Sequence, residues 1–198
     1  MVWYIAAIAT GYVLGSIPFG LLITRLAGLG DIRAIGSGNI GATNVLRTGR
    51  KDLALATLLL DSFKAGLAVY LLTVISGERN VGLIAGAFAF LGHCYPVWLN
   101  FKGGKGVATY AGLLVFASPL ALAVGAPIWL GLFALTRISS LAALSAAALV
   151  PIGAYLLGET QFAVGTLAAL SILIFWSHRE NIKRLLNGTE PKFGSKSK

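Results

Sequence analysis

The residues best suited to chemistry lie in one glycine- and amide-rich stretch, Gly36–Arg47, here called the first segment. Its glycines are Gly36, Gly38 and Gly41. Glycines let the backbone turn through positive φ and bring N–H groups close to a ligand. Its short polar side chains are Ser37, Asn39, Thr43 and Asn44. If a helix begins near Asn39, then Thr43 and Asn44 share one face with Arg47. Loop amides, a helix N-terminus and a fork-shaped cation predict an anion site, with a plain capped helix start as the alternative.

A second polar stretch, Phe101–Thr109, is here called the second segment. It places Lys105 among three glycines, Gly103, Gly104 and Gly106. It is not a Walker A motif, because the glycine spacing and the preceding soluble strand are both missing. The pattern predicts a flexible loop of backbone donors, with Lys105 as a point charge for a phosphate group. A plain interfacial turn is the alternative interpretation.

The third segment, His178–Leu186, follows the last apolar run. His178 and Asn181 are three residues apart, so on a helix they share a face at the membrane border. If the three segments converge, they would bind an anionic polar ligand at the inner membrane surface. Two glycine loops with separate cations, Arg47 and Lys105, indicate two phosphate groups; Arg33 is a further candidate cation.

Two charged residues lie inside an apolar run. Asp61 and Lys64 are three residues apart, and charges at membrane depth are costly unless they are paired or face a polar cavity. The pattern predicts either a structural ion pair or support for the site. His93, near the end of another apolar run, is interpreted as a hydrogen-bonded structural residue rather than a catalyst.

The composition is that of a polytopic membrane protein, with 57% hydrophobic and 12% charged residues. The net charge of +9 does not indicate nucleic-acid binding, because the cations cluster at the ends of apolar runs, where topology and anionic lipid headgroups favour them. Two histidines and the single Cys94 are too few for a metal-ligand cluster. Seven carboxylates, none closely paired in these segments, also disfavour a magnesium site. We therefore expect no metal and no cofactor.

The apolar runs predict an all-α bundle of seven transmembrane helices in one domain, 1–198. The expected spans are 2–26, 53–76, 81–99, 107–117, 120–136, 139–157 and 162–177. Residues 107–136 are split at Ser118-Pro119, because the split returns Arg137 and the basic tail to the cytoplasm. The basic loop 27–52 is cytoplasmic by the same rule, which puts the N-terminus outside and the C-terminus inside. The tail, 188–198, is expected to fray.

The three segments together resemble the three cytoplasmic motifs of the PlsY family, the bacterial acyl-phosphate:glycerol-3-phosphate acyltransferases. The resemblance covers nearly the whole chain and implies a seven-span inner-membrane fold with the active site facing the cytoplasm. It implies the first acylation of phospholipid biosynthesis, in which acyl phosphate and glycerol 3-phosphate give 1-acyl-glycerol-3-phosphate and inorganic phosphate. The residues it assigns are Ser37 and Arg47 as essential, the glycines around Lys105 as the glycerol-phosphate loop, His178 and Asn181 for activity, and Glu180 as a structural acid.

Several points stay open at this level. An acyl phosphate is already activated, so no covalent intermediate is needed, and the base is either His178 or the phosphate of the bound substrate. The sequence does not decide whether the chain contacts the soluble enzyme that produces acyl phosphate. The residues alone also allow a membrane transporter or channel for a phosphorylated small metabolite, because small bundles with charges such as Asp61 and Lys64 suit transport.

Overall fold

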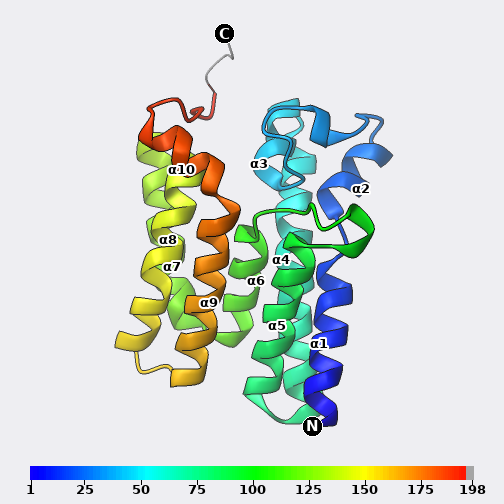
Figure 1. The fold of residues 1–198 in the computed structure, drawn as a ribbon, viewed down its shortest axis with the longest axis vertical. Coiled ribbons are helices and arrows are strands. Elements are labelled where there is room, and N and C mark those ends of the chain that lie inside the picture. Colours follow the sequence, from blue (N-terminus) through cyan, green and yellow to red (C-terminus); the bar gives the residue numbers. More distant parts are fainter. Residues whose placement is uncertain (195–198) are drawn as a thin grey trace. The chain divides into compact units, whose positions relative to one another are not determined.

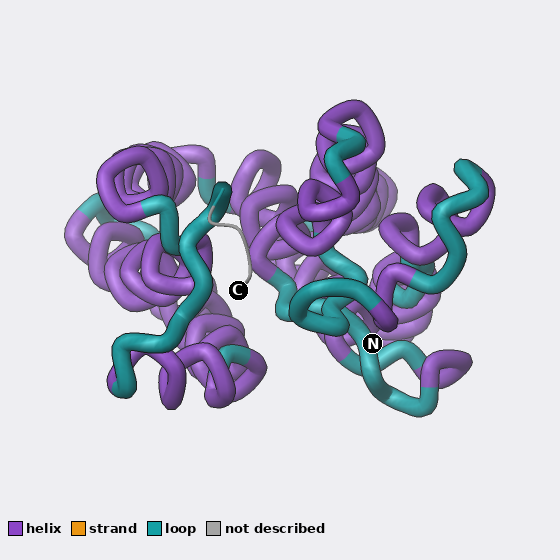
Figure 2. Tube along the Cα trace, turned by 90° about the horizontal axis from the view of Figure 1, so that it is seen from above, coloured by secondary structure: helices purple, strands orange, loops and turns teal. Residues whose placement is uncertain are grey.

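Helices are the regular secondary structure of residues 1–194, the residues that the computed structural model describes, and Figure 2 shows no strand among them. It divides into two compact units, Met1–Ala117 and Ser118–Lys198, where the sequence predicts one domain. The first unit contains α1 (Val2–Gly15), α2 (Phe19–Leu26), α3 (Ala42–Val45), α4 (Lys51–Ser76), α5 (Arg79–Cys94) and α6 (Val107–Ala117) (Figure 1). The second contains α7 (Pro119–Thr136), α8 (Ser139–Leu156), α9 (Gln161–Ser177) and α10 (Arg179–Leu186).

Glycines bring the long helices of the first unit into backbone contact. α1 packs against α5, and a Cβ on Gly11 or Gly15 would overlap the carbonyl group of Ala85 or Ala89. Gly112 of α6 meets the backbone of α4 in the same way. Small residues at such contacts let helix backbones approach closely, which is the usual basis of helix association in membranes.

The first apolar run is broken, although the sequence predicts one continuous span over 2–26. α1 ends before Pro18 and α2 begins after it, because proline has no N–H and its ring clashes with the preceding turn of a helix. The break leaves the carbonyl group of Ile17 outside the regular helix pattern. This carbonyl accepts a hydrogen bond of 2.8 Å from Nζ of Lys64, a residue in the middle of α4.

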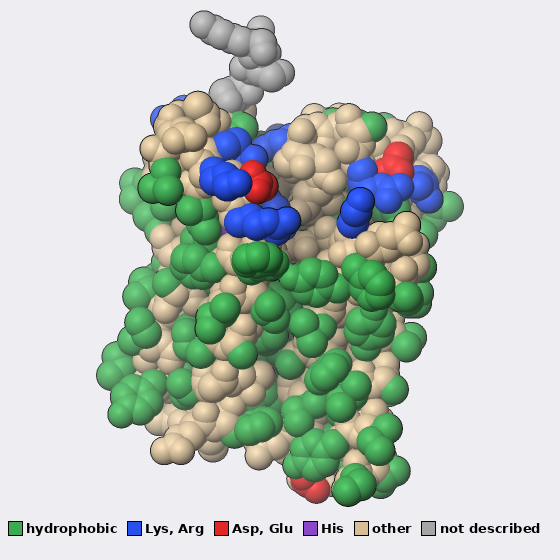
Figure 3. All heavy atoms as spheres, viewed as in Figure 1, with side chains coloured by type: hydrophobic (Ala, Val, Ile, Leu, Met, Phe, Trp, Pro, Cys, Tyr) green, Lys and Arg blue, Asp and Glu red, His purple; other side chains and the backbone are tan. Residues whose placement is uncertain are grey.

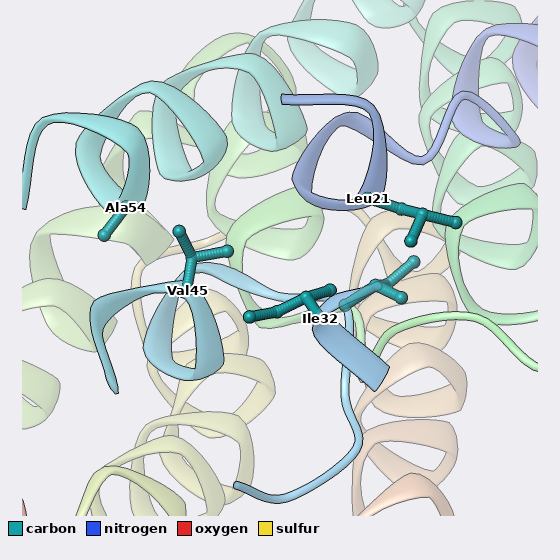
Figure 4. Close-up of a cluster of buried hydrophobic side chains, with 5 residues drawn as sticks. Leu21, Ile32, Val45 and Ala54 are labelled. Carbon is teal, nitrogen blue, oxygen red and sulfur yellow. The ribbon is translucent and has the colours of Figure 1, made fainter. Parts of the chain in front are cut away.

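A buried apolar cluster holds the loop 27–50, which contains the first segment, against the unit. Its members are Leu21, Ile32, Ile40, Val45 and Ala54, each at most 6% exposed. Leu21 comes from α2 and Ala54 from α4, whereas the other three belong to the loop (Figure 4). The loop therefore buries an apolar underside of its own, and it is a folded surface rather than a loose connection.

The second unit begins where the sequence predicts a division. α6 ends at Ala117, Ser118 is the N-cap of α7, and Pro119 occupies the first helical position, where its missing N–H costs nothing. α8 packs against both α7 and α9. α9 and α10 form a bent pair with an angle of 62°, and His178 lies at the bend.

Five spans of the described chain are long and apolar enough to cross a membrane, with α1 and α2 counted as one. The bent pair α9 and α10 makes a sixth if it is one span. α6 has only 11 residues, about 16 Å, which is half of a hydrocarbon core. The count of seven spans therefore stays a prediction.

Lysine and arginine side chains gather toward one end of each unit, while hydrophobic side chains cover the sides (Figure 3). In the first unit this is the end of α2 and α3, away from Met1 (Figure 1). In the second unit it is the end of α10, away from the turn between α8 and α9 (Figure 1). Cations at a membrane border favour the cytoplasmic side, so the expected orientation remains our prediction.

Candidate functional site

Asn44 is the centre of the first segment. The residue is 2% exposed, and its Oδ1 accepts hydrogen bonds from the backbone N–H of Ser37 at 3.0 Å and from its Oγ at 3.3 Å. Its Nδ2 donates to three backbone carbonyl groups, those of Ile32, Ile35 and Asn39, at 2.8–3.0 Å. The sequence places Asn44 on a ligand-binding face with Thr43 and Arg47. The structure turns it inward, so its role is to fix the shape of the loop.

The turns of the first segment match the glycine pattern in part. Gly36 and Gly38 have positive φ angles of 58° and 69°, as the sequence predicts. Gly41 does not: its φ is −80°, and its N–H donates to Oδ1 of Asn39 at 2.9 Å. The helix begins at Ala42 rather than near Asn39, since the side chain of Asn39 closes a turn of its own before the helix.

Arg47 and Ser37 lie exposed beside Gly36. A Cβ on Gly36 would come within 2.9 Å of Nη1 of Arg47, so the arginine side chain lies directly against this glycine. Among residues 1–194 the guanidinium of Arg47 has no hydrogen-bond or ion-pair partner, and its five donors are available to a ligand. This is the arrangement expected of a site that binds an anion by a fork of donors.

Arg33, which the sequence offers as another cation for the site, is held by a carboxylate. Its Nε and Nη2 donate to Asp31 at 2.5–3.1 Å, and Arg25 reaches the same carboxylate at 3.0 Å. The hydrogen bonds from Arg33 hold the pKa of the Asp31 carboxyl well below its usual range. The guanidinium of Arg33 is thus already paired with a carboxylate, unlike that of Arg47.

The second segment folds back onto the end of α5 and is less flexible than the sequence predicts. The N–H of Gly103 donates to the carbonyl group of Cys94 at 3.0 Å, and that of Gly104 to His93 at 2.9 Å. These two amides are therefore occupied by the protein, which corrects their expected role as phosphate donors. The glycines are needed for close approach, because a Cβ on Gly104 would overlap the imidazole of His93. Lys105 follows directly and is half-buried.

Asp61, Lys64 and His93 form a buried cluster beneath the second segment. Nζ of Lys64 donates to Oδ1 of Asp61 at 2.8 Å and to Nδ1 of His93 at 2.9 Å. Each of the three residues is at most 4% exposed. The sequence predicts a pair here but cannot show that His93, 29 residues away, is its third member. His93 is hydrogen-bonded, as the structural interpretation requires.

His178 lies between α9 and α10 and is 4% exposed. Its Nδ1 is 2.8 Å from the carbonyl oxygen of Ile174. A carbonyl oxygen only accepts hydrogen bonds, so Nδ1 carries a proton there. In the neutral imidazole Nε2 is then the unprotonated nitrogen, and it is the atom that could take a proton from a substrate.

Glu190 joins the third segment to the tail and is the functional candidate that sequence reasoning missed. Its Oε1 accepts hydrogen bonds from Asn181 at 2.6 Å and Ser140 at 2.7 Å, while Oε2 accepts from Arg184 at 2.7 Å. Burial raises the pKa of the Glu190 carboxyl, but these hydrogen bonds and the charge of Arg184 outweigh it and lower the pKa. The contacts fix the amide of Asn181, whose Nδ2 must face the carboxylate.

The tail differs from expectation, while the role of Glu180 stays a prediction. Glu180, proposed as the structural acid, is an exposed residue paired with Lys183 at 3.3 Å. The expected fraying of 188–198 does not hold for the part that includes Glu190, and Phe193 donates its N–H to the carbonyl of Arg137 at 2.7 Å. Residues 195–198 lie outside the described residues. The signal for Glu190 was weak, because it is nine residues from Asn181 in the chain.

The first and second segments both belong to the first unit, and the third belongs to the second unit. The structure brings Ser37, Arg47 and Asn44 together, and it places Lys105 directly after the glycines that cover His93. His178 is the N-cap of α10, and Asn181 lies in the first turn of the same helix. That all three segments meet on one ligand stays a prediction.

Comparison with known proteins gives a consistent result. The family model described as glycerol-3-phosphate acyltransferase matches residues 5–188. A protein of that name from Hyphomonas neptunium is 68% identical over 98% of this chain and 95% of its own, and one from Maricaulis maris is 60% identical over 97% and 88%. The crystal structure of PlsY, an integral membrane glycerol 3-phosphate acyltransferase, in its glycerol 3-phosphate form has a TM-score of 0.90 at 36% identity and covers 96% of both chains. Its lysophosphatidic acid form has a TM-score of 0.88 at 35% identity, covering 96% of this chain and 95% of that one. The chain therefore has the helical membrane fold of PlsY and belongs to the glycerol-3-phosphate acyltransferase family.

Proposed function

We propose that the protein transfers an acyl group from acyl phosphate to the 1-hydroxyl of sn-glycerol 3-phosphate. The products are 1-acyl-glycerol-3-phosphate (lysophosphatidic acid) and inorganic phosphate, and the reaction is the first acylation of phospholipid biosynthesis. The observation that carries the proposal is the guanidinium of Arg47, which has no partner within residues 1–194 and lies beside Ser37 on a loop fixed by Asn44. The family supports glycerol 3-phosphate as the acceptor.

The chemistry suits a chain with few carboxylates and many cations. The 1-hydroxyl oxygen bonds to the acyl carbonyl carbon, the bond from that carbon to the phosphate oxygen breaks, and phosphate leaves with the electron pair. Because the donor is already activated, the enzyme has to align two anionic reactants and stabilise the oxyanion. Arg47 and Lys105 offset the repulsion between the reactants, and Ser37 with nearby backbone N–H groups contacts a phosphate or the oxyanion. No cofactor takes part in this reaction.

The third segment supplies the proton acceptor and a positioning amide in this proposal. The hydroxyl proton goes to Nε2 of His178, which is the unprotonated nitrogen of the neutral ring because Nδ1 donates to Ile174. The phosphate of the bound substrate, with a second pKa near ~6, is the competing acceptor. Asn181, held by Glu190, offers its amide to the reactants. If His178→Ala reduces turnover only a few-fold while substrate binding is intact, the substrate phosphate is the base.

The proposed location is the inner membrane, with the cationic end of each unit on the cytoplasmic side. Both reactants carry phosphate groups, and the acyl donor is a lipid that enters from the bilayer. The positive charge gathered at these ends would attract the reactants and anionic headgroups alike (Figure 3). A contact with the soluble enzyme that produces acyl phosphate is part of the same proposal and would occur on this side.

The deciding experiment follows phosphate release by the purified protein with palmitoyl phosphate and glycerol 3-phosphate. We expect turnover that depends on both reactants and gives lysophosphatidic acid, identified by mass spectrometry. Palmitoyl-CoA is the contrasting donor, with release of free CoA as its readout. Turnover with the thioester and none with palmitoyl phosphate would overturn the proposed donor, while the acyltransferase assignment would stand.

A further inference from the structure

The ammonium of Lys64 makes three directed contacts that join three separate parts of the first unit. It donates to Oδ1 of Asp61 at 2.8 Å, to the carbonyl of Ile17 at 2.8 Å and to Nδ1 of His93 at 2.9 Å. These use all three hydrogens of the ammonium. The ring of Phe19 lies 5.7 Å away as a further neighbour. Neither the proposed chemistry nor the anion site uses this cluster, since Lys64 is 2% exposed.

We propose that Lys64 is a positioning residue that sets the geometry of the first and second segments together, and thereby the affinity for glycerol 3-phosphate. The inference rests on the proposed function for its substrate. It assigns the cluster a specific task, which goes beyond a general contribution to stability.

The link to the second segment runs through His93. Because an ammonium only donates hydrogen bonds, Nδ1 of His93 is the acceptor of the contact with a charged Lys64, and the proton of the neutral ring is then on Nε2. The ring edge that carries Nε2 packs against Gly104, so closely that a Cβ there would overlap it. The carbonyl of His93 also accepts the N–H of Gly104. Both the ring and the backbone of His93 thus hold the residue that precedes Lys105.

The link to the first segment runs through the break between α1 and α2. Ile17, which accepts a hydrogen bond from Lys64, directly precedes Pro18 and the start of α2. Gly20, in the first turn of α2, lies against the carbonyl of Ile40, and a Cβ there would overlap it. The position at which α2 starts therefore sets where the loop of the first segment lies.

The buried charges of Asp61 and Lys64 are hard to explain by their contribution to stability alone. Replacing a buried ion pair by apolar residues of similar volume is often neutral or stabilising, because desolvation offsets the attraction. Apolar side chains would fill the volume but could not direct three hydrogen bonds to three segments. The cluster should therefore be replaceable for folding and not replaceable for substrate affinity.

The test compares two variants with the wild type. Asp61→Leu/Lys64→Met removes both charges without leaving one unpaired. We expect it to fold with a thermal midpoint near that of the wild type. Its KM for glycerol 3-phosphate should rise by about tenfold while its KM for palmitoyl phosphate changes little. His93→Asn keeps an acceptor for Lys64 but removes the ring beneath Gly104, so it should raise the same KM if the double variant fails to fold.

The control is Leu72→Ala, a cavity on the same helix α4. We expect it to lower the thermal midpoint, as core truncations do, and to leave the KM for glycerol 3-phosphate unchanged. Hydrogen exchange of residues 100–106, measured by mass spectrometry without substrate, gives a readout independent of activity. Exchange should speed up by about tenfold in the double variant and not in the control.

The inference would be overturned if a folded double variant, or His93→Asn, showed unchanged exchange and an unchanged KM for glycerol 3-phosphate. It would also be overturned if Leu72→Ala changed both quantities as much as the double variant does. If the wild type has no turnover with either donor, the proposed function fails instead. Exchange of residues 100–106 then still decides whether Lys64 positions the loop.

Discussion

At the scale of single residues, Arg47 has donors that the described part of the protein leaves unused. We expect Arg47→Ala to lower kcat/KM for glycerol 3-phosphate on the order of a hundredfold, because a charge-assisted fork of hydrogen bonds is lost. Arg47→Lys should recover little of this, since a lysine is a point charge without the planar fork. The thermal midpoint should hardly change, because no partner within residues 1–194 is left unpaired.

Arg50 provides the matched control for this prediction. It lies three residues further on, is exposed, and is paired with Asp52 at 2.6 Å. Arg50→Ala removes the same charge from the same loop, and we expect little change in kcat/KM. Equal losses in both variants would mean that the net charge of the loop, rather than the fork of Arg47, attracts the substrate.

The side-chain amide of Asn44 stabilises the loop of the first segment. Asn44→Asp keeps the shape but removes the donors to Ile32, Ile35 and Asn39, and it sets a negative charge against their carbonyl oxygens. Unsatisfied buried groups cost about 1–3 kcal/mol each, so we expect a thermal midpoint lower by several degrees and loss of turnover. Asn80→Asp, the same change at an exposed position, should alter neither. Unchanged stability in Asn44→Asp would show that the loop is held mainly by its apolar cluster.

At the scale of elements, the sequence is informative where a local signal agrees with the hydrophobic pattern. The division at Ser118-Pro119 was predicted because it returns Arg137 and the basic tail to the cytoplasm. The structure adds that Pro119 occupies the first helical position, where proline suits a new helix. Pro18 carries a similar signal but was missed, because membrane helices also tolerate proline as a kink. The partner that stabilises the break is Lys64, 47 residues away, and no local pattern reveals it.

The sequence predicted which residue types form the candidate site, but not which way each side chain faces. Ser37 and Arg47 were identified and lie on the exposed side of the first segment. Asn44 has the same chemical character but is turned inward, because the carbonyl groups of the loop converge on its amide. Glu180 was named only through the family resemblance and Glu190 was not considered, whereas the returning tail brings Glu190 into contact with Asn181.

The hydrogen bonds of Glu190 join α8, α10 and the tail, and the stability that they contribute should depend on pH. The pKa of this carboxyl is lower in the folded protein than its ordinary value of 4.5, so the carboxylate contributes stability above about pH 4.5. This contribution is lost as the pH falls through the folded pKa. We expect the thermal midpoint of Glu190→Gln to lie below that of the wild type at pH 7, with the gap shrinking as the pH falls below about 4.5. Glu180→Gln should show no such gap.

A gap for Glu190→Gln that stays constant with pH would contradict the role of the ionised carboxylate. Features that do not titrate, such as shape or hydrogen bonds that a glutamine amide cannot reproduce, would then account for the whole gap. The activity of Glu190→Gln at pH 7 is a second readout: because Asn181 loses part of its fixed partner, we expect a lower kcat with little change in KM for either reactant.

At the scale of the whole molecule, one physical rule connects the two units. Each exposes hydrophobic side chains along its sides and gathers lysine and arginine toward one end (Figure 3). In a bilayer we expect these sides to face lipid, and from the positive-inside rule we predict that the cationic end of each unit faces the cytoplasm. The proposed reaction needs this prediction to hold for both units. The orientation can be tested separately in each unit.

Single cysteines provide that test, because Cys94 is buried and can be replaced by alanine to give a cysteine-free background. In the first unit we choose Lys51→Cys and Asn80→Cys, at the two ends of the bundle. In the second unit we choose Gln161→Cys and Lys183→Cys, at the two ends of the α9–α10 pair. We expect a membrane-impermeant maleimide to label positions 80 and 161 in intact spheroplasts, and positions 51 and 183 only after permeabilisation. Labelling of 51 and 183 on different sides would place the reactive segments across the bilayer from each other, and no single anion site could then use both Arg47 and His178.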